Sequence, residues 1–355
     1  MTWRTHVKTP RPRGPVSAAL VDLFSNRTSS AATELSAALQ KSTAAALDEL
    51  PDLLQNDDVQ VALFAAYELR YSGLTGVTDD WEWHPAVLEF CAAIERSFEQ
   101  TLRERVPLPP VPAPGTDSVA AALFELTGSN SGPSVSRYIA KKATDEQAHE
   151  FLIQRSVYQL KEADPHSWAI PRLRGRAKAA LVEIQADEYG GGRFERMHSE
   201  LFARTMRGLG LDDTYGHYVD AVPAITLASS NMMTMFGTHR RLRGAIAGHL
   251  AAFEMTSALP NRLYGNGFRR LGYDAGVTHY FDEHVEADAV HEQIAARDLA
   301  GALSEDEPTL VADIIFGAAA GLYIDGLAGT QMLTAWAGGE SSLRTESPIQ
   351  AGVPA

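Results

Sequence analysis

Residues 281–292 read FDEHVEADAVHE and place His284, Asp288 and His291 at spacings of four and three residues. On an α-helix, at about 100° per residue, these three side chains fall within roughly 60° of one another. Neutral imidazole and carboxylate together suit iron, manganese or zinc, and this spacing lets one helix deliver several ligands to one site. The stripe is therefore a candidate metal site. The alternative interpretation is an acidic, solvated helix face that happens to carry two histidines.

Other carboxylates and histidines in the chain are candidate partners for this helix. Glu254 lies in GHLAAFEM (248–255), where its neighbours are almost wholly apolar. A buried, unpaired carboxylate is costly, so we expect Glu254 to be protonated, ion-paired or metal-bound. Glu195 and His198 have the Glu-x-x-His spacing that helical di-iron proteins use. That pair also fits an ordinary polar helix face.

Two more carboxylates precede this pair. Glu188 lies seven residues before Glu195, which is two helical turns on one face, and Glu162 ends a predicted helix at 134–162. Glu162 also fits a surface ion pair with the lysine before it. Three consecutive glycines at 190–192 cost a helix on the order of 2–3 kcal/mol relative to alanine. We therefore expect an interruption between the two acids before metal binds.

The apolar residues recur at helical spacing along most of the chain, and no convincing alternating strand pattern appears. The sequence therefore predicts an all-α fold. A proline-rich spacer at 107–115 cannot be helix or central strand. We expect an N-terminal helical extension at 1–116 that ends in this linker, a core at 117–340 and a flexible tail at 341–355. Within the core the predicted helices are 117–127, 134–162, 175–189, 193–209, 213–237, 240–258, 274–300 and 308–335.

Composition limits the class of protein. The chain has 355 residues, 45% of them hydrophobic, which is enough to bury a full core. Its net charge of −14 argues against a nucleic-acid partner. A single cysteine, Cys91, excludes an intramolecular disulfide and fits a reducing cytoplasm. We see no run of about 18 predominantly apolar residues and no signal peptide, so we expect a cytoplasmic protein without a membrane partner.

The ordered series of candidate ligands resembles the ligand pattern of the haem-oxygenase-like di-iron oxidases, and its spacing is closest to N-oxygenating members of that superfamily. Two motifs support the resemblance, AFEM at Glu254 and the His-x3-Asp-x2-His helix, and AHEFLIQR (148–155) is similar to the superfamily's first core helix. The resemblance covers about residues 134–300. It implies a haem-oxygenase-like helical bundle. The series is Glu162, Glu188, Glu195, His198, Glu254, His284, Asp288 and His291.

The resemblance also implies how these residues divide. Glu162, His198 and His284 look like ligands of one iron, and Glu188, Asp288 and His291 look like ligands of the other; Glu195 and Glu254 are then extra or bridging carboxylates. Members of this superfamily use two ferrous ions per chain and O2 as co-substrate. They oxidise an amine or a C–H bond of a small molecule such as an amino acid or a fatty acid. An external electron donor and a homodimer are further expectations.

For the substrate, Arg262 and Tyr264 follow the Glu254 helix in a segment expected to be a loop, 260–267. Arg262 suits a substrate carboxylate, although an arginine there also suits a helix C-terminus. Two other functions stay open: a metal-free enzyme of the same fold, and a non-enzymatic iron-binding or partner-binding protein. Haem is not expected, because His149 is the only histidine near the start of the core that suits a proximal ligand.

Overall fold

The computed structural model describes residues 6–26, 29–49, 52–128 and 134–344, with the side chains of 29–32 and 286–289 left out. Over these residues the chain is helical, and the β-structure consists of one isolated bridge between Val7 and Leu74. The all-α fold predicted from the sequence is confirmed. The α-helices are α1 (Pro15–Ser25), α2 (Ser29–Glu49), α3 (Asp57–Glu68), α4 (Pro85–Arg105), α5 (Thr116–Gly128), α6 (Val135–Lys141), α7 (Asp145–Gln159), α8 (Asp164–Ser167), α9 (Gly175–Glu188), α10 (His198–Gly208), α11 (Ala224–Thr238), α12 (Arg243–Met255), α13 (Ala258–Leu271), α14 (Ala275–Gln293), α15 (Ala302–Asp306) and α16 (Val311–Ala337).

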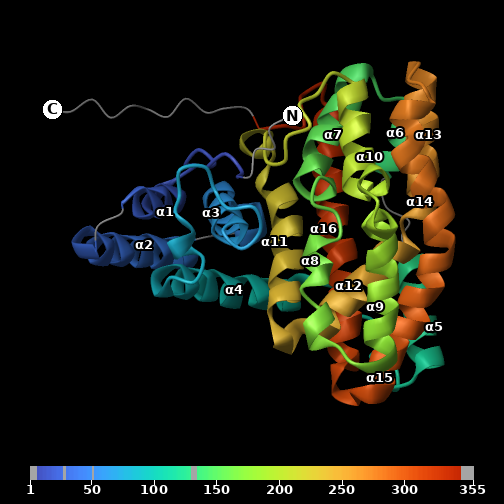
Figure 1. Cartoon of the computed structure of the whole chain (residues 1–355), viewed down its shortest axis with the longest axis horizontal. Coiled ribbons are helices and arrows are strands. Elements are labelled where there is room, and N and C mark those ends of the chain that lie inside the picture. The colour runs from blue at the N-terminus through green and yellow to red at the C-terminus, as the bar shows by residue number, and fades with distance from the viewer. Residues whose placement is uncertain (1–5, 27–28, 50–51, 129–133, 345–355) are drawn as a thin grey trace.

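Helices α1 to α4 form a group beside the bundle of later helices, with α11 between the two groups (Figure 1). Helix α3 packs against α11. At this contact the buried Asn231 amide donates to the backbone oxygen and the side-chain oxygen of Gln60, at 2.9 and 2.8 Å. Buried polar groups need such partners, so this pairing fixes how α3 sits on the bundle. The boundaries expected at residues 116 and 340 stay predictions.

Glycines bring α12 and α16 together at the centre of the bundle. A Cβ on Gly248 would lie 1.8 Å from the backbone oxygen of Ile314, and one on Gly317 would lie 1.9 Å from that of Ala245. Only glycine permits backbones to approach this closely. The crossing places α12, which carries Glu254, next to the long buried helix.

The same helix corrects an expectation from the sequence. Residues 308–337 form a helix that is long and apolar enough, by length and composition, to cross a membrane. The expectation that the chain contains no such apolar run was therefore wrong. Alanine and glycine, which are small but apolar, fill much of this segment. In the structure 61% of its apolar window is buried in the bundle, as in the core helix of a soluble protein.

Two predicted helices are shorter or divided. The one expected at 134–162 consists of α6 and α7, because Thr144 and Gln147 form a capping box that starts a new helix, with bonds of 3.3 and 3.1 Å. The one expected at 213–237 begins only at Ala224, because Pro223 has no N–H and cannot sit inside a helix without breaking a bond.

The prediction of a loop at 260–267 is wrong, since these residues lie within α13. Pro260 falls in the first helical turn, where its missing N–H does no harm. Gly267 allows α13 to contact α6, since a Cβ there would lie 2.5 Å from the backbone oxygen of Ile139. Gly267 is therefore a helix-packing position.

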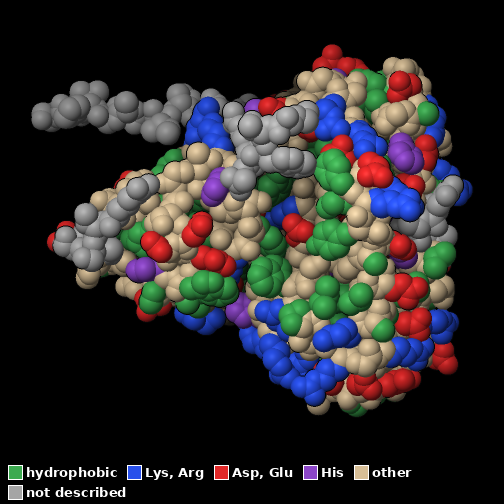
Figure 2. Space-filling view, viewed as in Figure 1, with side chains coloured by type: hydrophobic (Ala, Val, Ile, Leu, Met, Phe, Trp, Pro, Cys, Tyr) green, Lys and Arg blue, Asp and Glu red, His purple; other side chains and the backbone are tan. Residues whose placement is uncertain are grey.

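The helix predicted at 274–300 is confirmed, with one difference. Asp274 caps α14 by accepting from the backbone N–H of Val277 at 3.1 Å. Beyond Gln293 the chain continues as a π-helix over Ile294–Gly301. Such segments are rare and often lie near functional sites. On the face of the molecule shown in Figure 2, acidic and basic side chains are interspersed.

Candidate metal centre

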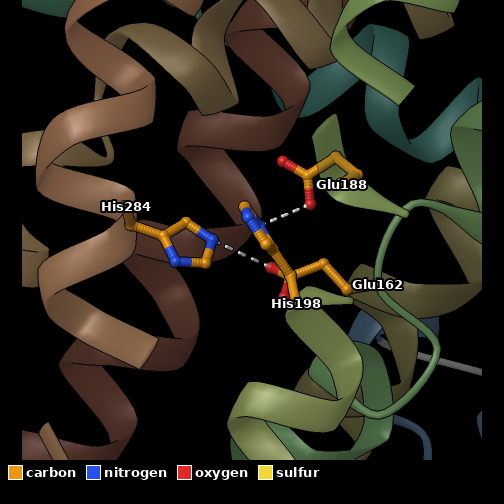
Figure 3. Close-up of side chains that lie close together, drawn as sticks. All are labelled: Glu162, Glu188, His198 and His284. Carbon is orange, nitrogen blue, oxygen red and sulfur yellow. Dashed lines mark ion pairs between the residues drawn. The ribbon is translucent and has the colours of Figure 1, made fainter. Parts of the chain in front are cut away.

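Two groups of buried side chains inside the bundle have the composition of metal sites. The first comprises Glu162, Glu188, His198 and His284, and the second comprises Glu188, Glu254 and His291. Within each group one ligand atom per residue lies within 4.8 Å of every other. Glu188 belongs to both groups. Figure 3 shows the four side chains of the first group pointing toward one another.

Glu162 and His284 meet across the bundle. Glu162 lies in the buried turn between α7 and α8, and its Oε1 is 3.6 Å from Nε2 of His284. The Tyr280 hydroxyl donates to the Glu162 carboxylate at 2.9 and 3.0 Å. The other ring nitrogen of His284, Nδ1, lies 2.8 Å from the backbone oxygen of Tyr280. This contact selects the tautomer that presents an Nε2 lone pair to the cluster.

The glycine segment brings Glu188 and His198 together. Helix α9 ends at Glu188, α10 begins at His198, and Gly190–Gly192 all have positive φ, between 61° and 77°. Only glycine adopts these values without strain. A Cβ on Gly190 would lie 2.6 Å from the backbone of Met197, so the turn is also tightly packed. The chain therefore reverses direction after α9, and His198 Nδ1 lies 2.9 Å from Glu188 Oε2.

The second group joins α12 and α14. His291 Nδ1 lies 3.4 Å from the carboxylate of Glu254, and both side chains are buried. The other nitrogen, Nε2, is 3.0 Å from Oδ2 of Asp187, which is 64% exposed. Histidines that bind metals usually bond a carboxylate or carbonyl through their second nitrogen, which fixes the ring. Asp187 gives His291 that arrangement.

Several atoms in the two groups have no aligned hydrogen-bond partner among the described residues. They are Glu188 Oε2, His198 Nδ1 and His291 Nδ1, all buried. Buried polar atoms are normally bonded, so each such atom needs an explanation. All three are atoms of residues in the two groups, and each lies near an oppositely charged side chain of its own group. Carboxylate with imidazole is a donor set that suits iron or manganese. The residues therefore fit a bound divalent metal.

Charge compensation in the cluster depends on protons. Burial raises the pKa of Glu188, but the imidazoles of His198, His284 and His291 together outweigh burial and hold the pKa at about 2. Burial lowers the pKa of His291, but Glu254 and Asp187 outweigh it and raise the pKa to about 9. The pKa of His198 is raised as well, since Glu188 outweighs burial. Protonated imidazoles thus balance buried carboxylates, and a divalent cation would replace those protons.

Of the ligands inferred from the sequence, the structure brings six together and leaves Glu195 apart. Glu195 is exposed in the 3-10 turn Phe194–Arg196. The helix expected at 193–209 begins only at His198, so Glu195 and His198 do not share a helix face. The interruption expected at the glycines is confirmed, and it explains why counting two turns from Glu188 fails. The side chain of Asp288 lies outside the described residues.

The grouping also differs from the expected division at two residues. Glu188 was assigned to one metal with Asp288 and His291, whereas it lies with both groups. Glu254 was left as an extra or bridging carboxylate, whereas it lies with His291 in the second group. Sequence spacing cannot show this, because ligand atoms from different helices meet only after packing.

The two substrate candidates have different surroundings. Arg262 is exposed on α13, whereas Tyr264 is buried, with its ring 4.6 Å from that of Phe151. Sequence reasoning missed Tyr280 and Asp187. Tyr280 had a signal, since it precedes His284 by one helical turn, but the exposed Asp187 had none. His149 contacts the backbone oxygens of Asp145 and Leu209 with its two ring nitrogens, at 2.7 and 3.0 Å.

Comparison with known proteins identifies relatives of this chain. The sequence model of a family described as iron-containing redox enzymes matches residues 149–326, half of the chain. Nitrosourea synthase of Streptomyces achromogenes subsp. streptozoticus is 25% identical over 183 residues. That alignment covers 52% of this chain and 39% of the relative, so the chain spans well under two thirds of nitrosourea synthase. The residues matched by the family model include every member of the two candidate groups.

Proposed function

The chain belongs to the family of iron-containing redox enzymes, and from this premise we propose that it is a non-haem di-iron oxidase or oxygenase. In this proposal two ferrous ions per chain activate O2 to oxidise a small molecule, at an amine nitrogen or a C–H bond. The family supports an iron-containing oxidoreductase. The number of irons, the use of O2 and the type of substrate are our proposal.

The observation that carries the proposal is the position of Glu188. Its carboxylate lies with Glu162, His198 and His284 on one side and with Glu254 and His291 on the other. A carboxylate has two oxygens and can serve two cations. A site for one metal would not need two groups of ligands that meet at a shared carboxylate. Two-metal sites are a recurrent arrangement in metalloenzymes, with the ions about 3.5–4 Å apart.

Each residue has a role in the proposed site. Glu162, His198 and His284 would hold one ion, Glu254 and His291 the other, and Glu188 both; Asp288 joins the second set on the sequence pattern alone. Bound ferrous iron would supply the electrons that reduce O2.

The surrounding residues keep this site in order. The Tyr280 hydroxyl orients the Glu162 carboxylate, and Asp187 orients His291. Both contacts hold ligand atoms in one geometry before a metal arrives, which favours binding. Because the ligands are buried, water is kept from the reacting centre, and electrostatic interactions there are stronger.

The test is an anaerobic titration of the metal-free protein with ferrous iron, followed by exposure to O2 and stopped-flow absorbance. We expect about two irons per chain and a transient visible absorbance after O2. Replacing His284 by alanine removes a ligand and should abolish the absorbance.

The matched control is Glu195→Ala, which removes a nearby carboxylate that lies outside both groups. It should bind iron and react like the wild type. If iron does not bind, or if His284→Ala behaves like the wild type, the two groups are not the metal site and the proposal fails.

A further inference from the structure

The turn between α7 and α8 is tied to the N-terminal helices by a buried ion pair. Lys161 lies in this turn, and Glu68 is the last residue of α3. Nζ of Lys161 lies 2.5 Å from Oε1 of Glu68, and the two side chains are 5% and 0% exposed. Breaking a buried pair leaves an uncompensated charge inside the protein, which is strongly unfavourable. The pair therefore holds the turn and α3 in a fixed relation.

Aromatic rings near Lys161 restrict where its ammonium group lies. Nζ is 4.3 Å from the centre of the Tyr71 ring and 5.3 Å from the centres of the Phe64 and Tyr215 rings. A cation is attracted to the face of an aromatic ring at such distances. The Tyr215 hydroxyl also donates to Oε1 of Glu68 at 2.6 Å. Phe64 lies in α3 and Tyr71 follows it closely, so the N-terminal region supplies most of the groups that fix Lys161.

The backbone of the turn is strained immediately after Glu162. Ala163 has a φ of 76°, and it is the one non-glycine residue with a positive φ in the part of the chain that the structure describes. A Cβ disfavours this left-handed conformation, so the conformation persists only where neighbouring structure enforces it. The Gln185 side chain of α9 donates to the Ala163 backbone oxygen at 2.8 Å. The Lys161–Glu68 pair holds the same turn from α3.

This strained turn carries a ligand of the candidate metal centre. Residues 160–163 connect α7 to α8, and Glu162 lies between Lys161 and the strained Ala163. The Glu162 carboxylate lies 3.6 Å from Nε2 of His284, and the Tyr280 hydroxyl orients it. Tyr280 contacts the side chain of Glu162, so the position of the Glu162 backbone depends on the turn. Because one peptide bond joins Lys161 to Glu162, a displacement of Lys161 also displaces the ligand.

We propose that α3, acting through Lys161, positions Glu162 for metal binding. Lys161 and Glu68 are then positioning residues, since both act through Glu162. Iron binding by the first group, which contains Glu162, depends on them, whereas iron binding by the second group, which lacks Glu162, does not. Groups that orient metal ligands contribute about 10–100-fold to metal affinity. This inference rests on the proposed function, to which it adds a role for the N-terminal helices.

The ion pair also stabilises the fold, and the two roles are separable. In the double variant Lys161→Met with Glu68→Met no buried charge is left unpaired, so most of the stability is retained. If the pair only stabilised the fold, this variant would bind iron like the wild type. If the pair positions Glu162, the first group binds iron about tenfold more weakly or worse, because flexible methionine side chains make no directional contact between α3 and the turn.

The experiment measures the iron affinity of each group separately. Glu254→Ala removes a ligand of the second group, so the iron that remains reports on the first group. His284→Ala removes a ligand of the first group, so the iron that remains reports on the second. The double change is introduced into each of these variants, and the full chain is titrated anaerobically with ferrous iron in competition with a chelator. We expect about tenfold or greater weakening in the Glu254→Ala chain and an unchanged affinity in the His284→Ala chain.

Two further variants serve as matched comparisons in the Glu254→Ala chain. Lys161→Arg keeps a cation and hydrogen-bond donors opposite Glu68, and it should lose less iron affinity than the double variant. Tyr67→Phe removes a buried hydrogen bond of α3, from the Tyr67 hydroxyl to Oε1 of Glu95 at 2.8 Å, and leaves Lys161 unchanged. It should lower the midpoint of urea unfolding and bind iron like its parent, because lost stability alone does not displace Glu162.

Two results overturn the inference. One is an unchanged iron affinity of the double variant in the Glu254→Ala chain. The other is an equal loss in the Glu254→Ala and His284→Ala chains, since the effect would then not act through Glu162. Both results leave the proposed function standing. Failure of the proposed function is seen in the wild type itself, which would then bind no iron.

Discussion

Lys161 and Glu162 are neighbours in one turn, yet they belong to two different buried charge clusters. Lys161 points to the N-terminal helices, where its Nζ lies 2.5 Å from Glu68 Oε1 and 4.3 Å from the centre of the Tyr71 ring. The Tyr215 hydroxyl donates to the same Glu68 oxygen at 2.6 Å. Glu162 points the other way, into the group of carboxylates and imidazoles (Figure 3). One short turn therefore serves both clusters.

The difference between the clusters lies in how their charges are balanced. The Lys161–Glu68 pair has one charge of each sign, fixed in place by its neighbours, and needs nothing from solution. The two candidate metal-binding groups contain Glu162, Glu188 and Glu254, and imidazoles balance these acids only while they carry protons. The charges of the first cluster balance as folded, whereas a cation would balance those of the second. We expect substitutions in the two clusters to differ in kind.

The largest effect is expected from the carboxylate that the two groups share. Glu188→Ala should lose both irons, because each group loses a ligand. Glu254→Ala should keep about one iron per chain, since the group of Glu162, His198 and His284 is intact. Iron per chain after desalting, measured by metal analysis, checks the difference. Equal iron contents in the two variants would show that Glu188 is not shared.

In the other cluster the expected effect is on stability. Lys161→Met leaves Glu68, which is fully buried, without its counter-charge, and should lower the free energy of unfolding by about 3–5 kcal/mol. Urea denaturation measures this. The double variant Lys161→Met with Glu68→Met should recover most of the loss, because no charge is then left unpaired. A double variant as unstable as the single one would mean that packing, and not charge, is responsible.

A third buried group, His166 and His249, sharpens the comparison because it carries no charge. Their ring nitrogens lie 3.1 Å apart, and burial lowers the pKa of His166 from 6.5 to about 4. Between pH 6.5 and about pH 4, His166 therefore binds a proton in the unfolded chain but not in the folded chain. The free energy of unfolding therefore falls as the pH is lowered through this range. The expected loss between about pH 7 and pH 4 is about 3 kcal/mol.

This loss is isolated by comparing the pH dependence of the metal-free wild type with that of His166→Phe. The variant lacks the titrating imidazole and should lose about 3 kcal/mol less over the same interval. Identical pH profiles would indicate that folding does not lower the pKa of His166.

The smallest effect is expected outside the buried ligands. Asp187 is 64% exposed and contacts only the second nitrogen of His291 among the described ligands. Asp187→Asn should weaken iron binding by about 10–100-fold, because His291 is less well oriented, and leave the stability of the metal-free chain nearly unchanged. Competition with a chelator measures the affinity. The control Asp213→Asn removes an acid that pairs with Arg207 and lies outside both groups, and an equal loss there would count against a specific role for Asp187.

Those parts of the candidate centre that depend on residues close together in the sequence could be predicted. His284 and His291 are on one face of one helix, so their spacing alone brings them together, and Glu254 was visible as an acid among apolar residues. The separation of Glu195 from the two groups has a physical cause. Helical spacing was extended across three glycines, and positive φ values there turn the chain. The loop expected at 260–267 failed similarly, because glycines used for close helix packing were taken for turn residues.

The sequence by itself determined the all-α class and the chemical types of the ligands, because helical periodicity and residue chemistry are local properties. Tertiary structure decided which ligands share an ion, since Glu188 meets residues from several helices only when they pack. It also decided that Lys161 and Glu162 serve opposite clusters. Distances between remote side chains depend on the packing of whole helices, which no local pattern records.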